Sequence, residues 1–189
     1  MSLRNRNVAT LEGFVGDNYF DLVTDVSETW ERIKQSPHYK EDFGVALFTR
    51  MFEAAPDMWV HFPWGLEGHN HHLLESPHLA AVARQFTKML DRAIEMLGPD
   101  LQLVENQLQW LGVSHAYLGL TPVHYTLIGQ ALMATLESKL GAGSGHPRKF
   151  TRRHKDSWNT IYSFISTSMI QGAFLDLKRV SSVSKIGTH

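Results

Sequence analysis

The feature that most constrains this 189-residue chain is a hydrophobic face that recurs every three to four residues between positions 79 and 97. Such spacing places the apolar residues on one side of an amphipathic helix, and that side must be buried against another element. Ser76 and Pro77 suit the cap and the first position of this helix, and Gly98 with Pro99 ends it. The residues of the face are Leu79, Val82, Ala83, Phe86, Leu90, Ala93, Ile94 and Leu97.

Similar periodicity covers most of the chain and predicts further helices at 19–35, 43–55, 101–118, 122–140 and from Thr151 onward. A short aromatic turn follows Pro56, and the segments 66–77 and 141–149 have the composition of loops. The alternation typical of strands is nearly absent. The sequence therefore predicts an all-α protein with one globular domain.

Composition excludes several classes of protein. The formal net charge is −1, and the one basic cluster (148–155) fits a solvated helix start, so nucleic acid is not an expected partner. The chain contains no cysteine, which excludes disulfides, thiolate metal sites and cysteine nucleophiles. No apolar run approaches the roughly 18 residues of a membrane span, and the first residues do not resemble a signal peptide, so we expect a cytoplasmic protein. Sequence motifs of hydrolases and nucleotide enzymes are missing.

One histidine of the predicted 101–118 helix lies on the helix face that we expect to point into the protein interior. Leu108 and Leu111 precede His115 by seven and four residues, and Leu118 follows it by three, so all four side chains share an apolar face. A buried neutral imidazole needs a hydrogen-bond partner, and taken alone this pattern is typical of a histidine satisfied within a core. Its sequence context favours a second interpretation, a metal ligand.

Six motifs, in order, resemble the globin family from about Asp21 to Gly172. They are a tryptophan in the first helix (Trp30), LFxRMFxxxPxxxxxF from Leu47, a helix that begins at SP, LGxxHxxxGL from Leu111, HYxxIGxxLxxxL from His124 and FTxxxxxxWxxxYxxxxxxMxxG from Phe150. The resemblance implies a globin fold, a helical sandwich of seven or eight helices around a haem pocket. It also divides the chain into an N-terminal extension (1–20), a globin domain (21–174) and a disordered tail (175–189).

By this resemblance, His115 is the proximal ligand of the iron of haem b. A hydrogen bond on its other ring nitrogen would orient the imidazole, and either the Leu111 carbonyl or the Ser114 hydroxyl is able to provide it. Phe62 matches the phenylalanine that packs against the porphyrin. Further positions that match the lining of the haem pocket are Leu120, Tyr125 and Ile128.

The distal side departs from the family pattern. Val82 stands where the distal histidine is usual, and Phe86, Phe48 and Phe62 surround it, so the pocket has no obvious hydrogen-bond donor. Bound dioxygen acquires partial negative charge, and a donor to a charged group contributes about 1.5–3 kcal/mol. We therefore expect fast oxygen release, fast autoxidation and a relative preference for CO or NO. Gln85 is a candidate donor at the pocket edge.

A histidine-rich loop offers another distal group. One of its histidines would make the resting iron six-coordinate if it reached the pocket, although the alternative is a solvated loop. The histidines are His61, His69, His71, His72 and His78.

Two function classes follow. The first is a haem globin that reversibly binds a diatomic gas, for oxygen binding or transport, sensing or redox chemistry. Within this class, NO dioxygenase or peroxidase-like side activity stays open, and the former needs an external reductase. The second is a haem-free globin-fold interaction or signalling module, since fold alone does not fix function. His115 favours haem, whereas the phenylalanines of the distal pocket favour the haem-free module. The sequence leaves the oligomeric state open.

Overall fold

The computed structural model describes residues 18–62, 76–98, 101–141 and 149–186. In this part of the chain every regular element is helical, which confirms the all-α prediction. The elements are α2 (Tyr19–Ile33), α3 (Tyr39–Ala54), the 3₁₀-helix η2 (Pro56–His61), α4 (Pro77–Glu95), α5 (Leu101–Tyr117), α6 (Pro122–Leu140) and α7 (Arg152–Ile186).

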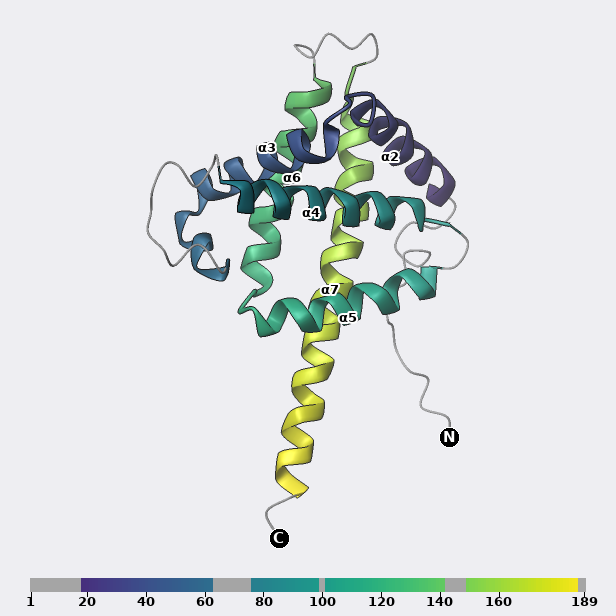
Figure 1. Cartoon of the computed structure of the whole chain (residues 1–189). Coiled ribbons are helices and arrows are strands. Elements are labelled where there is room, and N and C mark those ends of the chain that lie inside the picture. Colours follow the sequence, from purple (N-terminus) through teal and green to yellow (C-terminus); the bar gives the residue numbers. More distant parts are fainter. Residues whose placement is uncertain (1–17, 63–75, 99–100, 142–148, 187–189) are drawn as a thin grey trace.

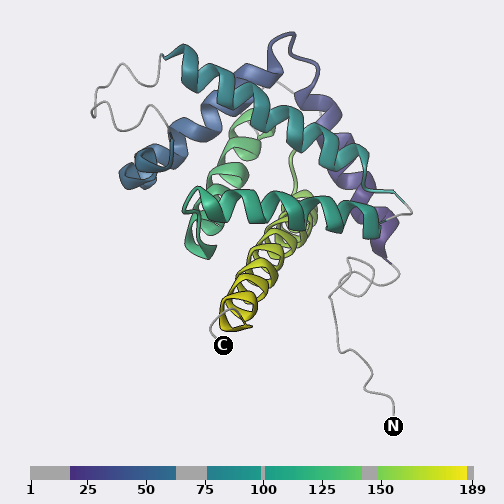
Figure 2. The same ribbon diagram turned by 60° about the horizontal axis from the view of Figure 1, so that its bottom comes forward.

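The helices form two crossing sets. Helices α4 and α5 both run across α6 and α7, and α2 lies over the end of α7 at which that helix begins (Figure 1). The turned view shows that α4 and α5 approach each other at one end and diverge toward the other (Figure 2). The predicted aromatic turn after Pro56 is the 3₁₀-helix η2, which follows directly on α3.

Glycines set the two closest helix crossings. A Cβ at Gly44 of α3 would lie 2.3 Å from the Ala83 carbonyl oxygen of α4. Gly112 of α5 and Gly172 of α7 have the same role, because a Cβ at Gly112 would lie 1.9 Å from the Met169 carbonyl oxygen. Helix α4 is thus fixed against α3, and α5 is fixed against α7. Neither crossing draws α4 and α5 together.

Local sequence signals explain where α4 and α6 begin. Ser76 caps α4, since its hydroxyl oxygen accepts a hydrogen bond from the His78 amide, and Pro77 occupies the first position. Helix α6 starts with a capping box between Thr121 and His124, in which the His124 ring nitrogen accepts from the Thr121 amide at 2.9 Å.

A cluster of hydrogen-bonded tryptophans joins α2 to its neighbours, and we call it the Trp30 cluster. The Trp30 indole donates to Asp91 of α4, and its ring packs edge-to-face on Trp158 of α7, 5.8 Å between centroids. The Trp158 indole donates to the Thr29 hydroxyl at 2.8 Å. The carboxylate of Asp25 accepts from Arg153 and Ser157, both at 2.8 Å. The Trp30 cluster comprises Asp25, Thr29, Trp30, Asp91, Arg153, Ser157 and Trp158.

Two boundaries differ from the sequence analysis. Helix α3 begins at Tyr39 rather than at residue 43, because the Tyr39 hydroxyl donates to Asp91 and draws the extra turn onto α4. Helix α7 continues to Ile186, so the expected disordered tail is helical over residues 175–186. Residues 173–186 contain neither glycine nor proline. Once a helix has formed, each further residue that joins it adds one backbone hydrogen bond, so the helix continues through this segment.

No helix in the described ranges is both long enough and apolar enough to cross a bilayer.

Candidate functional site

A cavity of about 450 Å³ lies between α4 and α5, and we call it the α4–α5 cavity. Helices α3, α6 and α7 and the 3₁₀-helix η2 supply the rest of its wall. Its volume is in the range of sites for small molecules and cofactors. The side chains that line it are almost all aliphatic, aromatic or methionine, so the space suits an apolar ligand.

His115 lines this cavity from α5, and its backbone hydrogen bond fixes its tautomer. Its Nδ1 lies 2.9 Å from the Leu111 carbonyl oxygen. A carbonyl only accepts, so Nδ1 carries the proton and the neutral ring keeps its lone pair on Nε2. The Ser114 hydroxyl donates to the Trp110 carbonyl instead, at 3.5 Å. Of the two orienting partners considered from the sequence, the structure therefore has Leu111.

The wall around His115 includes two tyrosines. The Tyr125 ring lies 6.5 Å from the His115 ring between centroids, and the Tyr162 hydroxyl donates to the Tyr125 carbonyl. Gly129 makes room for this arrangement, because a Cβ there would lie 2.4 Å from the Tyr162 ring. Burial raises the pKa of the Tyr125 phenol above its ordinary value. The Tyr125 hydroxyl has no hydrogen-bond partner among the described residues, and the phenol stays protonated at neutral pH.

The opposite wall is aromatic. Phe48 of α3 contacts Phe62 and Phe86 edge-to-face, with centroids 5.8 and 5.6 Å apart. Val82 lies on the same wall, one helical turn before Phe86. Gln85 is the one α4 residue of the lining that has a hydrogen-bonding side chain, and its amide has no partner within the described part of the chain.

His61 stands at the edge of the cavity. Its Nδ1 donates to the Leu118 carbonyl at 3.0 Å, so it bridges η2 and the turn after α5. That turn requires Gly119, whose φ is 83°. The His61 ring lies 4.5 Å from the His124 ring between centroids. Burial, and secondarily His61, lowers the pKa of His124 below its ordinary value.

The other loop histidines contribute less to the described site. His78 is exposed on the first turn of α4 and does not line the cavity. The remaining candidates for a sixth ligand, His69, His71 and His72, lie outside the described residues.

All ten residues predicted for the site line this one cavity. They are Phe48, Phe62, Val82, Gln85, Phe86, Leu111, His115, Leu120, Tyr125 and Ile128. The sequence analysis missed other lining residues, chiefly Met51, Met58, Met89, Ala93, Leu132, Tyr162, Ile165 and Met169. Helical spacing would have found some of them, because Met89 and Ala93 lie three and seven residues after Phe86 on the same face.

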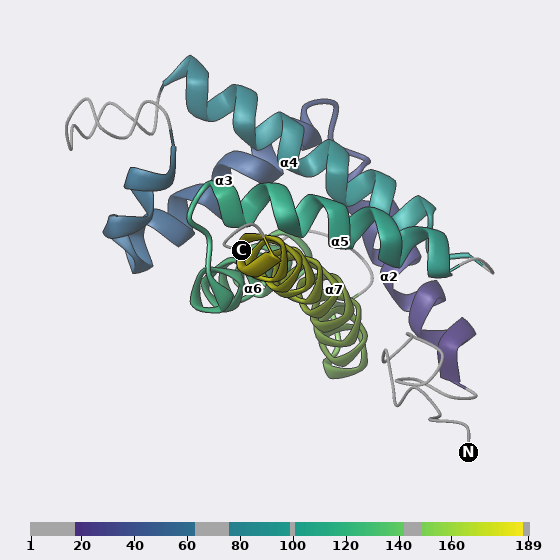
Figure 3. The same ribbon diagram turned by 90° about the horizontal axis from the view of Figure 1, so that it is seen from below.

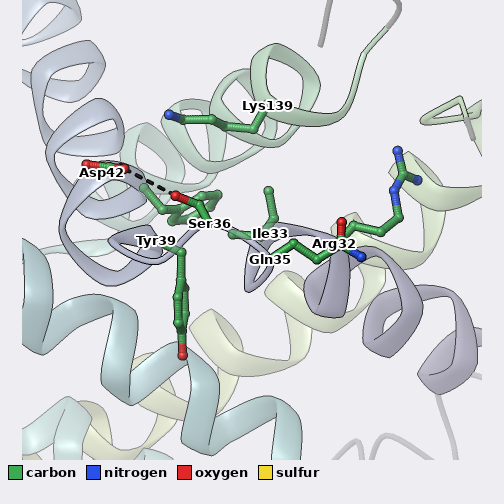
Figure 4. A pocket seen from close by; sticks show the side chains of 8 residues that line it. Arg32, Ile33, Gln35, Ser36, Tyr39, Asp42 and Lys139 are labelled. Carbon is green, nitrogen blue, oxygen red and sulfur yellow. Dashed lines mark hydrogen bonds between the residues drawn. The ribbon is translucent and has the colours of Figure 1, made fainter. Parts of the chain in front are cut away.

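A second pocket, of about 290 Å³, lies at the turn between α2 and α3, and both polar and apolar side chains line it (Figure 4). Ser36 and Asp42 are hydrogen-bonded across it at 3.4 Å, and Tyr39 extends away from it toward α4. Lys139 borders it from α6. None of the residues predicted for the functional site borders this pocket.

Similar proteins were found at both the sequence and the fold level. A family model for globins matches residues 45–169. Neuroglobin of Danio rerio is 28% identical over 148 residues, which covers 78% of this chain and 87% of the relative. Neuroglobin of Tetraodon nigroviridis is 27% identical over 145 residues, which covers 76% and 85%.

Solved structures agree on the fold. Hemoglobin from the botfly Gasterophilus intestinalis superposes with a TM-score of 0.68 at 16% identity and covers 81% of this chain and 97% of its own. A globin of Drosophila melanogaster gives 0.66 at 20% identity and covers 80% and 92%.

The residues of the cavity fit a haem group. Its wall combines the Nε2 lone pair of His115, and at its edge that of His61, with aromatic side chains and an apolar volume, a set of groups that suits a haem held by histidine. The family model covers about two thirds of the chain and supports the globin resemblance seen in the sequence. The chain belongs to the globin family, and this membership implies that it binds haem and small gas ligands.

Proposed function

We propose that the chain holds haem b in the α4–α5 cavity through His115 and reversibly binds a diatomic gas, O₂, CO or NO, on the side of α4. One observation carries this proposal: the Leu111 carbonyl holds the proton on Nδ1 of His115, which leaves Nε2 as a ligand atom in an apolar cavity. Haem supplies the iron on which the gas binds. The chain supplies its position, its axial ligand and its dry surroundings.

The wall formed by Phe48, Phe62 and Phe86 excludes water and admits small neutral molecules. Val82 donates no hydrogen bond, so a gas ligand that gains negative charge receives no help from this position. We propose fast O₂ release, fast autoxidation and a relative preference for CO or NO. Since oxidation stops gas binding, an external reductase would keep the protein active.

Gln85 is the donor nearest to this wall. Its side chain is exposed and its amide has no partner among the described residues, so turning it toward a ligand would break hydrogen bonds to water only. Peroxidase-like chemistry needs a distal acid–base group. Neither Val82 nor an amide supplies one, and His61 at the edge of the cavity is held by the Leu118 carbonyl. Gas binding therefore fits the lining better than an acid–base reaction does.

Absorbance spectroscopy of the full-length protein, expressed with haem supply, tests the proposal. We expect a Soret band in the ferric, reduced and CO-bound forms, and we expect His115→Gly to lose the axial ligand. Added imidazole should restore the wild-type Soret band, because the space left by the His115 side chain accepts an imidazole molecule. His78→Ala is the matched control, since this exposed histidine lies outside the cavity.

Folded wild-type protein without a Soret band would contradict the proposal and favour the haem-free module. A Soret band that persists unchanged in His115→Gly would assign the iron to another ligand. Split visible bands in the reduced wild type would show a sixth protein ligand. His61→Ala would then restore one broad band if His61 leaves Leu118 for the iron, and an unchanged spectrum would exclude this role for His61.

A further inference from the structure

His61 joins three elements at the edge of the α4–α5 cavity. It is the last residue of η2, and its Nδ1 donates to the Leu118 carbonyl, in the turn after α5, at 3.0 Å. Its ring also packs on the ring of His124 in the first turn of α6, with centroids 4.5 Å apart. Figure 3, the view from below, shows η2 (blue) beside the turn (green) that leads from α5 into α6. His61 therefore lies where η2, this turn and α6 meet.

The turn that His61 contacts is wound around the backbone of His115. The His115 carbonyl oxygen accepts hydrogen bonds from the amides of Leu118 and Leu120, both at 3.1 Å. Gly119 lies between them, and a Cβ there would be 3.2 Å from Nδ1 of His61, so the imidazole lies directly over the turn. The hydrogen bond from His61 to Leu118 thus restrains the end of α5 three residues after His115.

The other side of this junction is the aromatic wall of the cavity. Phe62 follows His61 in the chain, and its ring contacts those of Phe48 and Phe52 edge-to-face, with centroids 5.8 and 5.3 Å apart. The 3₁₀-helix η2 has six residues, and 3₁₀ hydrogen bonds have poorer geometry than those of an α-helix. A hydrogen bond from its last residue to a segment 57 residues away adds order that η2 does not generate locally.

The protons on the two rings exclude a metal site between His61 and His124. Nδ1 of His124 accepts from the Thr121 amide at 2.9 Å, so the neutral ring carries its proton on Nε2. A metal would need that nitrogen without its proton. In the described ranges, no group of three or more histidine, cysteine or acidic side chains could hold a metal ion. The contact between the rings is therefore one of packing, and His61 acts through its bond to Leu118.

We propose that His61 is a positioning residue of the site, whose hydrogen bond to Leu118 holds the end of α5 that carries His115 against the end of η2 that leads into Phe62. The inference rests on the proposed function, in which His115 binds the iron. Helix ends fray unless they are held. Without this bond the last turn of α5 would adopt several orientations, and the His115 ring would follow them.

Hydrogen exchange of the full-length protein, expressed with haem supply, tests the bond itself. In His61→Ala we expect the amides of Leu118 and Leu120 to exchange about fivefold faster, which corresponds to about 1 kcal/mol, the net value of one hydrogen bond. His61→Asn should restore slow exchange, because its side-chain N–H replaces the Nδ1 donor. Val60→Ala is the matched control, since Val60 is the neighbouring residue of η2 and is 54% exposed. Circular dichroism checks that each variant folds.

Resonance Raman spectroscopy of the reduced, haem-loaded protein tests the effect on His115. The stretching band of the bond between iron and imidazole reports the orientation of the axial ligand. We expect this band to broaden or shift in His61→Ala and to return to its wild-type form in His61→Asn. It should stay unchanged in Val60→Ala. A role in folding alone would not move this band.

Four outcomes would overturn the proposal. Equal exchange in the wild type and His61→Ala would show that the bond does not hold the turn. Faster exchange with an unchanged iron–imidazole band would show that His61 does not position His115. Altered visible bands in both His61→Ala and His61→Asn would assign His61 to the iron as a sixth ligand. A wild type without a Soret band would contradict the proposed function as well, and the exchange comparison would then decide separately whether the His61–Leu118 bond holds the turn.

Discussion

The Trp30 cluster and the α4–α5 cavity are two interiors of one fold, and they are built in opposite ways. In the Trp30 cluster, Trp30, Trp158 and Asp25 pack closely and meet their hydrogen-bonding needs from the protein. The α4–α5 cavity instead has a volume of about 450 Å³, and the Tyr125 hydroxyl on its wall has no hydrogen-bond partner among the described residues. As a closed empty void, this volume would cost about 10 kcal/mol, comparable to the whole stability of a domain.

The difference follows from how the helices are fixed. Gly44 brings α3 against α4, and Gly112 brings α5 against α7, so each wall of the cavity is fixed to a neighbour rather than to the other wall. Side chains around Trp30 come from α2, α3, α4 and α7, and Trp30 itself is 1% exposed. The Trp30 cluster therefore meets its hydrogen-bonding needs within the protein, whereas the α4–α5 cavity has the volume and lining that a bound ligand would complete.

Removal of haem should have the largest effect on stability, and it should affect the α4–α5 cavity much more than the Trp30 cluster. A ligand present at about 1,000 times its Kd stabilises the folded state by about 4 kcal/mol, and the apo-protein loses this contribution. We expect hydrogen–deuterium exchange to increase mainly in α4 and α5, while α2 and the first half of α7 keep their protection. An equal increase in the Trp30 cluster would show that the two regions unfold as one unit.

Gly112→Ala should destabilise the protein by about 3 kcal/mol, because its Cβ would lie 1.9 Å from the Met169 carbonyl oxygen. The better helix propensity of alanine returns only about 1 kcal/mol. Urea unfolding measures the loss, and haem affinity should fall with it as α5 moves from α7. The control is Gly98→Ala, whose nearest contact would be 3.9 Å away. Equal stability of the two variants would show that the close crossing yields easily.

Asp25→Asn should cost about 2 kcal/mol at pH 7, since it removes a charged acceptor from two hydrogen bonds. Burial opposes ionisation of Asp25, but hydrogen bonds from Arg153 and Ser157 outweigh it and lower its pKa. Because the pKa of Asp25 is lowered in the folded state, its charge stabilises the protein at pH values above the ordinary carboxyl pKa. This stabilisation is lost as the pH falls through the lowered pKa.

Urea unfolding of the wild type and Asp25→Asn at pH 7 and below pH 4 measures this dependence, and the difference should narrow in acid. Asp42→Asn, which changes an exposed carboxylate, should cost little at either pH. A difference that stays constant with pH would mean that the Asp25 charge does not contribute.

Sequence reasoning predicted most of the helices and the ten lining residues, because both depend on local spacing. Proline, glycine and the 3.6-residue period locate α4 to within about two residues, and the same period places His115 and Leu111 on one face. What it could not predict depends on contacts between distant segments. The earlier start of α3 comes from Tyr39 meeting Asp91, 52 residues away.

The cavity is another feature that depends on contacts between distant segments. That a space remains between Val82 and His115 depends on two helix crossings, and no pattern within α4 or α5 encodes it. The choice of Leu111 over Ser114 as partner of His115 is a matter of side-chain rotamers, which spacing alone does not specify. The helical end of α7 was missed because its apolar residues face several directions, so no single stripe marks it.

Val82→Gln has the smallest expected effect and tests the lack of donors in the cavity directly. An amide at this position, on the wall opposite His115, should hydrogen-bond a gas ligand that gains negative charge. At about 1.4 kcal/mol, the low end for a bond to a charged group, O₂ release should slow about tenfold. Val82→Leu, which adds no donor, should leave the rate within about twofold. Stopped-flow displacement of O₂ by CO measures both.

An unchanged rate in Val82→Gln would mean that Gln85 already supplies the hydrogen bond. In that case Gln85→Leu, rather than a change at Val82, should accelerate release, and the cavity would contain one working donor.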